Sequence, residues 1–141
     1  MNYYADVILP LPIQGTFTYQ LTIEQSKLLG VGHRVAVSFG KRKIYTGVIK
    51  QIHNQKPDFS KLKPIEFSYD KKALVTKLQI EFWSWISKYY FTPIGDVLKA
   101  AIPSTFLLES DTIIIKKEID NGALEKLTEE EFLIYEALDF K

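Results

Sequence analysis

Hydrophobic and polar residues alternate with a period of two along most of the first seventy positions, which indicates short β-strands. The alternating segments are 3–9, 16–21, 34–39, 44–52 and 65–69, and turn-forming or strand-breaking residues separate them. Several short strands with turns between them predict a small, strongly bent antiparallel sheet or partial barrel that is OB-like. One face of that sheet must be buried, because each strand carries its apolar residues on one side.

The third and fourth segments form the clearest predicted hairpin. The turn between them is Gly40, Lys41, Arg42 and Lys43. Three consecutive cations after a glycine point into water and cannot belong to a core, so this turn indicates a polyanionic ligand. Ahead of the hairpin, Thr22 and Gln25 have the spacing of a capping box, which predicts one or two helical turns through about Leu28.

The period changes to about 3.6 residues after residue 72, which indicates helices. The apolar positions at helical spacing are Val75, Leu78, Phe82, Trp85, Ile86 and Tyr89. They predict a helix from about Thr76 to Tyr90. Further apolar residues widen the stripe beyond one face, so we expect this helix to be clamped between two surfaces, with its aromatic rings in the core. A second short helix should run from Pro93, with Thr92 as its N-cap, to Ala101.

The last part of the chain predicts the beginning of another domain. We expect a connector over 104–110, a strand over 112–118 and a turn at 120–122. A capping box at Thr128 and Glu131 predicts a helix that starts at Glu129. That helix reaches the end of the sequence before it can pack within a domain of its own, so we expect the chain to be a fragment of a longer protein.

Charge divides the chain at the same place. Residues 1–104 hold fourteen Lys and Arg against seven Asp and Glu, whereas residues 105–141 hold four against ten. We therefore predict two domains with these boundaries. Eight of the cations lie between Arg34 and Lys63, beside the single acid Asp58. Such a cluster on a β-rich segment is typical of a nucleic-acid-binding surface, and a solvated basic face without a partner is the alternative.

Several classes of function are not supported by the sequence. It contains no cysteine, so disulfides and thiolate metal sites are excluded. None of the common phosphate-binding or hydrolytic motifs occurs, and the two histidines, His33 and His53, lack a neighbouring ligand cluster. Asp96 lies where it would compensate a helix dipole. We expect no catalytic residue, metal or cofactor within this chain, and neither a signal sequence nor a membrane span, which makes the cytoplasm the default location.

Exposed aromatic and basic residues leave a binding surface as the remaining possibility. Phe17 and Tyr19 share one face of a strand, and Tyr45 follows the basic turn. Aromatic faces beside cations hold single-stranded nucleic acids without reading their sequence. The structural alternatives are that Phe17 and Tyr19 belong to the core, and that Gly40 is present because its turn needs a positive φ.

Taken in order, the landmarks of the chain resemble the N-terminal region of the primosomal replication-restart helicases, the PriA family (primosomal protein N′). The resemblance rests on the motifs LPLP, TFTY, GxRVxVxFGK and YYxxPIGDVLxAxxP, read in this order. The matching segments are 5–12, 16–19, 32–41, 89–90 and 93–103. Together they cover most of residues 1–104.

The resemblance implies that residues 1–104 are the family's 3′-terminus DNA-binding domain and that a truncated winged-helix domain begins at Phe106. In the family, this domain holds the 3′-OH end of the nascent leading strand at stalled or rebuilt replication forks and accepts any base. The ATP- and Mg-dependent helicase motor and the zinc-binding segments would lie outside this sequence. Expected partners are a single-stranded DNA 3′ end, the remaining domains of the parent helicase, primosome proteins and single-strand-binding protein.

The resemblance also assigns residues to the binding site. The expected pocket for the DNA 3′ end consists of Phe17, Thr18, Tyr19, Gly40 and Lys63. One wall should be the strand that ends at Phe39 and Gly40, and the other should be residues 16–19. Phosphate steering is expected from Lys41, Arg42, Lys43 and Lys61. Thr18 departs from the family pattern, which has an aspartate there; a threonine hydroxyl both donates and accepts hydrogen bonds but carries no charge.

Two other functions remain open on the sequence alone. The first is a protein-interaction module whose strands and basic turn dock the parent protein or a replisome partner. The second is a generic single-strand binder, which would be indifferent to which end of the strand is free.

Overall fold

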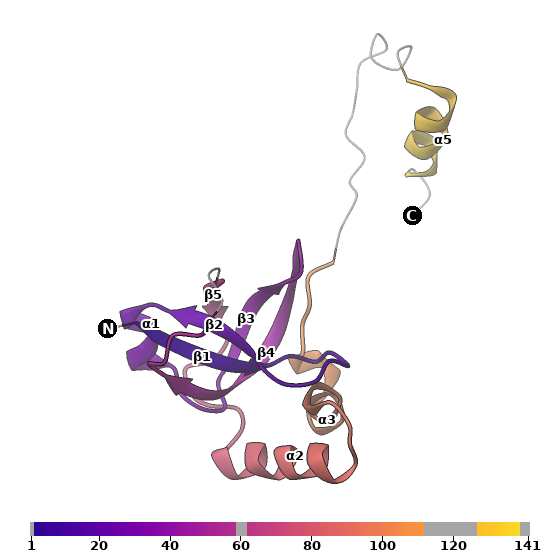
Figure 1. Cartoon of the computed structure of the whole chain (residues 1–141). Coiled ribbons are helices and arrows are strands. Elements are labelled where there is room, and N and C mark those ends of the chain that lie inside the picture. Colours follow the sequence, from indigo (N-terminus) through magenta and orange to yellow (C-terminus); the bar gives the residue numbers. More distant parts are fainter. Residues whose placement is uncertain (1, 59–61, 112–126, 139–141) are drawn as a thin grey trace. The chain divides into compact units, whose positions relative to one another are not determined.

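The computed structural model describes residues 2–58, 62–111 and 127–138 (Figure 1). The strands are β1 (Tyr3–Ile8), β2 (Phe17–Leu21), β3 (Arg34–Phe39), β4 (Lys43–His53) and β5 (Ile65–Ser68). The helices are α1 (Ile23–Leu28), α2 (Lys77–Tyr89), α3 (Ile94–Ala101), the 3₁₀ helix η1 (Ser104–Phe106) and α5 (Glu129–Ala137). The chain divides into two compact units, Met1–Ser110 and Asp111–Lys141.

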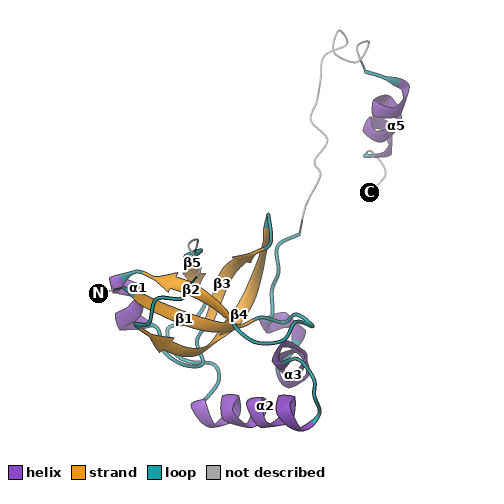
Figure 2. Cartoon of the chain, viewed as in Figure 1, coloured by secondary structure: helices purple, strands orange, loops and turns teal. Residues whose placement is uncertain are grey.

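The five strands of the first unit form one antiparallel sheet in the order β2-β1-β4-β3-β5. The sheet curls into a half-barrel, and the helices lie outside it (Figure 2). Its two edges approach each other where the amide of Gln20 on β2 donates a hydrogen bond to the carbonyl oxygen of Lys63, at 2.9 Å. The predicted α+β class and the bent, OB-like antiparallel sheet are confirmed.

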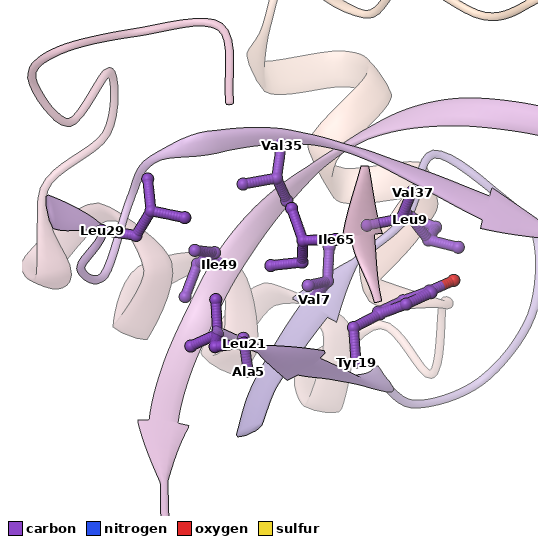
Figure 3. Close-up of a cluster of buried hydrophobic side chains, with 10 residues drawn as sticks. All are labelled: Ala5, Val7, Leu9, Tyr19, Leu21, Leu29, Val35, Val37, Ile49 and Ile65. Carbon is purple, nitrogen blue, oxygen red and sulfur yellow. The ribbon is translucent and has the colours of Figure 1, made fainter. Parts of the chain in front are cut away.

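The inner face of the half-barrel holds the main hydrophobic core (Figure 3). The buried residues are Ala5, Val7, Leu9, Tyr19, Leu21, Leu29, Val35, Val37, Ile49 and Ile65. Most of them come from alternate positions of the strands, as the period of two predicts. Burying one aliphatic side chain of this size contributes about 1.5–3 kcal/mol, so the cluster holds the strands in register.

A second core lies between the outer side of the sheet and the helices α2 and α3. Ile8 and Val48 of the sheet pack there against Ile80 and Trp83 of α2. Helix α3 approaches the chain after β1 so closely that a side chain at Gly95 would collide with backbone carbonyl groups there. The sheet is thus covered on both sides at β1 and β4, which makes these two strands the rigid centre of the unit.

Helix α2 corrects one sequence-based expectation. It begins after Thr76, close to the predicted start, and Thr76 caps its N-terminus, but only Ile80 and Trp83 are buried. Phe82, Trp85 and Tyr89 are 57%, 54% and 63% exposed. The expectation that α2 is clamped between two surfaces is wrong, because within the described part of this unit the helix lies against the sheet and α3 on one side and faces solvent on the other.

Part of the connector predicted for residues 104–110 also pairs with the sheet, through an isolated bridge between Tyr45 and Glu109. Strand β1 leaves β4 at Val48, so the preceding part of β4 has a free edge. The amide of Thr46 donates to the carbonyl oxygen of Leu108 at 2.8 Å, and the amide of Ser110 donates to that of Ile44 at 2.9 Å. The first unit therefore extends to Ser110, beyond the position where charge alone divides the chain.

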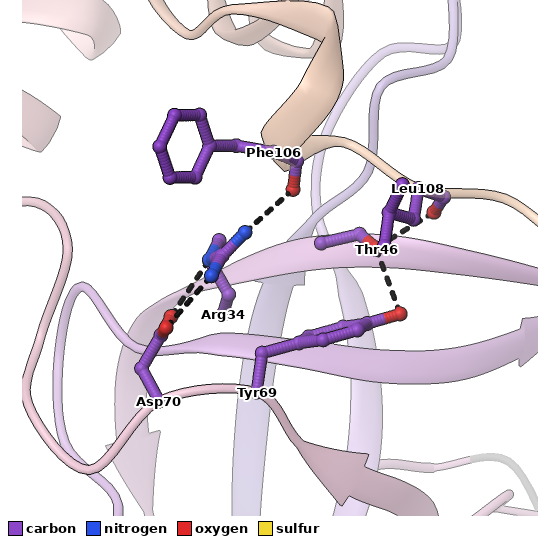
Figure 4. Close-up of polar contacts among 6 residues, drawn as sticks. All are labelled: Arg34, Thr46, Tyr69, Asp70, Phe106 and Leu108. Carbon is purple, nitrogen blue, oxygen red and sulfur yellow. Dashed lines mark hydrogen bonds and ion pairs between the residues drawn. The ribbon is translucent and has the colours of Figure 1, made fainter.

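Arg34 fastens this segment to the sheet (Figure 4). Its guanidinium donates two hydrogen bonds of 2.7 Å to the carboxylate of Asp70 and one of 3.0 Å to the carbonyl oxygen of Phe106. The same guanidinium lies 4.9 Å from the centroid of the Phe106 ring and 5.3 Å from that of Tyr69. Arg34 is thus a structural residue, although it counts among the eight cations of the basic cluster.

Of the second unit, the structure describes Asp111 and residues 127–138. Helix α5 begins after Thr128, whose hydroxyl accepts from the amide of Glu131 in the predicted capping box. The strand and turn predicted over 112–122 lie outside the described residues. The winged-helix identity of this unit stays a prediction.

Candidate nucleic-acid interface

All five residues expected to hold a DNA 3′ end line one pocket at the end of the half-barrel. The pocket has a volume of about 450 Å³. Its lining residues are Thr16, Phe17, Thr18, Tyr19, Ser38, Phe39, Gly40 and Lys63. They come from β2, from the end of β3 with its turn, and from the residues before β5. The curl of the sheet brings these three separate segments together.

Two contacts join β2 to β3 across the end of the barrel. The ring of Phe17 meets that of Phe39 edge to face, with 4.7 Å between centroids and 68° between planes. The hydroxyl of Tyr19 donates to the carbonyl oxygen of Ser38 at 3.2 Å. Burial raises the pKa of Tyr19 to about 12, so this hydroxyl stays protonated and remains a donor at neutral pH. These contacts give the pocket an aromatic wall and hold β2 against β3.

Lys63 and Gly40 form the opposite rim. The ammonium of Lys63 donates to the carbonyl oxygen of Gly40 at 2.6 Å. An ammonium carries three N–H donors, so two remain for a ligand. Gly40 has a φ of 68°, and a Cβ there would meet nothing within 4 Å. Gly40 therefore suits a turn that needs a positive φ, which was the structural alternative to a binding role, and the space around it is open.

The side chain of Thr18 lies on the other face of β2 from Phe17 and Tyr19. Thr18 pairs with Asp6 of β1, and its hydroxyl donates to Asp6 Oδ1 at 2.6 Å. Because successive side chains of a strand point to opposite faces, Thr18 can offer the pocket only its backbone. Thr18 thus lines the pocket, while its hydroxyl is bonded to Asp6 on the outer face.

Asp6 is the centre of a polar cluster on this outer face. Gln51 Nε2 donates to Asp6 Oδ2 at 2.6 Å, and His53 Nε2 lies 3.4 Å from Oδ1. Burial by itself would raise the pKa of Asp6, but the hydrogen bonds from Thr18, Gln51 and His53 outweigh it and lower the pKa. Asp6 is therefore ionised at neutral pH and locks the β2-β1-β4 part of the sheet.

The three cations of the basic turn are not equivalent. Lys43 forms an ion pair of 3.0 Å with Glu109, and its ammonium lies 5.2 Å from the centroid of the Tyr45 ring. Lys41 and Arg42 are exposed, and no ion pair joins either to another residue within the described ranges. Of the turn residues expected to steer phosphates, Lys41 and Arg42 are thus the ones for which no ion pair is found within the described ranges. Lys61 lies outside the described residues.

Sequence reasoning missed one lining residue, Ser38. It did expect Thr16 and Phe39 in the pocket walls, and Phe39 continues the alternation of Val35 and Val37 onto the inner face at the end of β3. Nothing in the sequence indicates that Ser38 contributes through its backbone carbonyl. Glu109 was also missed, since its approach to Lys43 depends on the pairing of a distant segment with β4.

The described ranges contain neither a metal-binding cluster nor a membrane-spanning helix. Within residues 2–58, 62–111 and 127–138, no three His, Asp or Glu side chains gather as a metal site would require. No helix in the same ranges is long and apolar enough to cross a membrane.

Comparison with known proteins adds independent findings. A family model for PriA, described as the 3′DNA-binding domain (3′BD), matches residues 6–103. Replication restart protein PriA of Buchnera aphidicola subsp. Acyrthosiphon pisum is 30% identical over 129 residues, 92% of this chain and 17% of that protein. The protein of the same name from Rickettsia felis is 26% identical over 122 residues, 86% of this chain and 18% of that protein. The one from Treponema pallidum is 26% identical over 105 residues, 72% of this chain and 16% of that protein. The chain therefore spans less than a fifth of the length of these relatives.

Proposed function

The chain belongs to the PriA 3′ DNA-binding domain family, whose members bind DNA in replication restart, and we propose that its pocket holds the 3′-OH end of the nascent leading strand at stalled or rebuilt forks without base selectivity. The observation that supports this proposal is the convergence of Phe17, Tyr19, Gly40 and Lys63 on one pocket. Its volume of about 450 Å³ lies within the usual range of pockets for small ligands.

The chemistry of the pocket suits a strand end. Its inner end consists of aromatic rings and backbone groups, where a phosphate would lose water without gaining a cation. The ring of Phe17 can pack on any base, because every base has a π-face. Lys63 lies at the rim, where its ammonium can meet the phosphate that precedes the terminal nucleotide. A free 3′-OH would fit, and a 3′-phosphate would not.

The test is a pair of short single strands that differ only at the 3′ end. Fluorescence anisotropy should show that the 3′-OH strand binds at least about tenfold more tightly than the 3′-phosphorylated strand, with little dependence on the terminal base. A 5′-phosphorylated strand with a free 3′-OH is the matched control for added charge. Equal affinities for the two 3′ ends would reject the proposal and leave generic single-strand binding.

Lys63→Ala tests whether the ammonium at the rim of the pocket contributes to DNA affinity. The variant should weaken binding of all 3′-OH strands, because it removes a phosphate contact that reads no base. Lys63→Arg retains the charge and should recover part of the affinity. If Lys63→Ala binds DNA with unchanged affinity and unchanged salt dependence, Lys63 does not belong to the site.

A second role, docking of other protein surfaces, is favoured by the outer face of α2. The rings of Phe82, Trp85 and Tyr89 stack along it with centroids 6.0 and 5.1 Å apart, and all three are more than half exposed. Solvent-facing aromatic rows of this kind are typical of interaction surfaces. We propose that this face contacts the remaining domains of the parent helicase, a primosome protein or single-strand-binding protein.

Hydrogen exchange distinguishes docking within the parent from an open surface. In the longer protein, the amides of α2 should exchange more slowly than in this chain alone, and its tryptophan emission should shift to the blue. Equal exchange in both forms would contradict docking within the parent.

We propose further that this chain acts in the cytoplasm as the DNA-holding part of an ATP-dependent helicase whose motor is not among these 141 residues.

A further inference from the structure

We propose that the pocket continues into a second subsite, which holds the penultimate nucleotide of the strand over Phe39 and Tyr45 and places its phosphates beside Lys41 and Arg42. This inference rests on the proposed function, because it assumes that the terminal nucleotide occupies the pocket. It adds the path by which the strand leaves that pocket.

A row of aromatic rings leads out of the pocket along the end of the half-barrel. Phe17 and Phe39 meet inside the pocket, and Phe39 in turn meets Tyr45 edge to face, with 6.4 Å between centroids and 73° between planes. Residues 37 and 45 are register partners on β3 and β4, so Tyr45 shares the inner face with Phe39. The pocket wall therefore continues past Phe39 as far as Tyr45.

The spacing of the rings suits successive nucleotides of an extended strand. Stacked bases are about 3.4 Å apart, so rings 6.4 Å apart can each contact a different base of a strand that is not stacked on itself. Phe39 and Tyr45 are both partly buried and pack against the core, which holds their rings in place. Rigid aromatic rings of this kind bind bases without sequence selectivity.

Charge indicates the direction in which the strand leaves. On the rim by β5, the Lys63 ammonium is bonded to Gly40, where it faces the phosphate that links the terminal and penultimate nucleotides. On the side of Tyr45, the turn presents Lys41 and Arg42, both exposed. Lys43 lies over the Tyr45 ring but is opposed by Glu109, so it contributes less to phosphate binding. The phosphates of the penultimate nucleotide should therefore lie beside Lys41 and Arg42.

The test measures affinity as the ligand grows by one nucleotide. Thymidine 5′-monophosphate, the dinucleotide and the trinucleotide, all with a free 3′-OH, are titrated into the whole chain. One base on an aromatic ring changes affinity by roughly 5- to 100-fold, so the dinucleotide should bind more tightly than the mononucleotide by a factor in that range. A dinucleotide that binds no more tightly than the mononucleotide overturns the second subsite.

Tyr45→Leu assigns that gain to its ring. Leucine keeps apolar contact with the core, so the variant should fold, and thermal unfolding checks that it does. It should bind the mononucleotide as the wild type does but lose most of the gain on the dinucleotide, while Tyr45→Phe keeps the gain. Phe67→Leu, at a half-exposed aromatic position on β5, is the matched control and should change the affinity for neither the mononucleotide nor the dinucleotide.

A spectroscopic readout separates stacking from a change in overall affinity. The fluorescence of 2-aminopurine at the penultimate position of a trinucleotide should be quenched when the strand binds the wild type. Binding to the Tyr45→Leu variant should leave that fluorescence largely unquenched. Equal quenching with both proteins would overturn the role of Tyr45. The two proposals fail in different ways: without a 3′-OH preference the pocket assignment is lost, whereas an intact preference with no effect of Tyr45→Leu rejects only the second subsite.

Discussion

Neighbouring residues of β2 have different functions because a strand presents every second side chain to the same face. Phe17 and Tyr19 point toward the pocket and the core, and Thr18 between them bonds to Asp6 on the outer face. A substitution at position 18 therefore acts on the sheet before it acts on the ligand.

Thr18→Val tests this division between the faces of β2. Valine has nearly the same shape but cannot donate to Asp6, and the loss of a hydrogen bond to a charged group costs about 1.5–3 kcal/mol. We expect a lower free energy of unfolding in urea and an unchanged affinity for 3′-OH strands. A tenfold loss of DNA affinity at unchanged stability would show instead that the hydroxyl contacts the ligand.

Among the contacts between elements, one joins two segments that lie far apart in the sequence. The segment after η1 pairs with the free edge of β4, next to the basic turn, and Arg34 holds it through Asp70 and Phe106. The hydrogen bonds from Arg34 lower the pKa of Asp70. A carboxyl group with a depressed pKa stabilises the fold above its ordinary value of 3.8 and loses that contribution as the pH falls through its lower value in the folded state.

Asp70→Asn should therefore destabilise the first unit in a pH-dependent manner. At pH 7 the free energy of unfolding should fall by about 1–2 kcal/mol, since the pair is only partly buried, and the amides of Thr46 and Ser110 should exchange faster. The difference between variant and wild type should begin to shrink as the pH falls below the ordinary aspartate pKa of 3.8, and it should continue to shrink until the pH passes the lower pKa of Asp70 in the folded state. A difference that is the same at pH 7 and pH 3 would reject this assignment.

The end of α2 contains the most unusual backbone conformation in the described ranges. Phe91 has a φ of 52° and is 91% exposed, at a position after the helix where glycine is common. A non-glycine residue in this conformation costs roughly 1–2 kcal/mol. The side chain gains almost no burial in return, so the strain is retained for a reason other than packing within the described part of this unit.

Phe91→Gly should raise the free energy of unfolding by about 0.5–1 kcal/mol, because relief of strain exceeds the added entropy of the unfolded chain. Phe91→Ala is the control, since it removes the ring but keeps a Cβ in the strained conformation, and it should not stabilise. Urea unfolding of the three proteins measures this. Equal stabilisation by Gly and Ala would point to the exposed ring, not the backbone, as the source of the cost.

The sequence predicted the local elements well because their periods and caps are local. The strands, both capping boxes of α1 and α5, and the helix after Thr76 follow directly from spacing. The exposure of Trp85 could not be predicted, because a wide apolar stripe does not reveal whether anything covers its second side. The pairing of residues 108–110 with β4 could not be predicted either, since it depends on where β1 leaves its neighbour.

For the molecule as a whole, counting cations overstates the charge available to DNA. The segment from Arg34 to Lys63 holds eight cations, but Arg34 is bonded to Asp70 and Lys43 is paired with Glu109. Lys41 and Arg42 remain exposed beside the pocket. The salt dependence of binding should therefore reflect these positions more than the net charge of the unit.

Alanine variants of the basic turn measure how much Lys41 and Arg42 contribute to the salt dependence of DNA binding. Replacing both Lys41 and Arg42 with alanine should weaken binding of all 3′-OH strands and lower the magnitude of the slope of log K against log salt by up to about 1.4, because each phosphate neutralised on a single strand contributes about 0.7. Lys71→Ala with Lys72→Ala removes the same charge beyond the opposite end of β3, so it should leave the slope nearly unchanged. Adding Lys43→Ala should change the slope by less than the average of the other two, because Glu109 already compensates that ammonium. If the control pair lowers the slope as much as the turn pair, the steering is a property of net charge, and the basic turn has no special place beside the pocket.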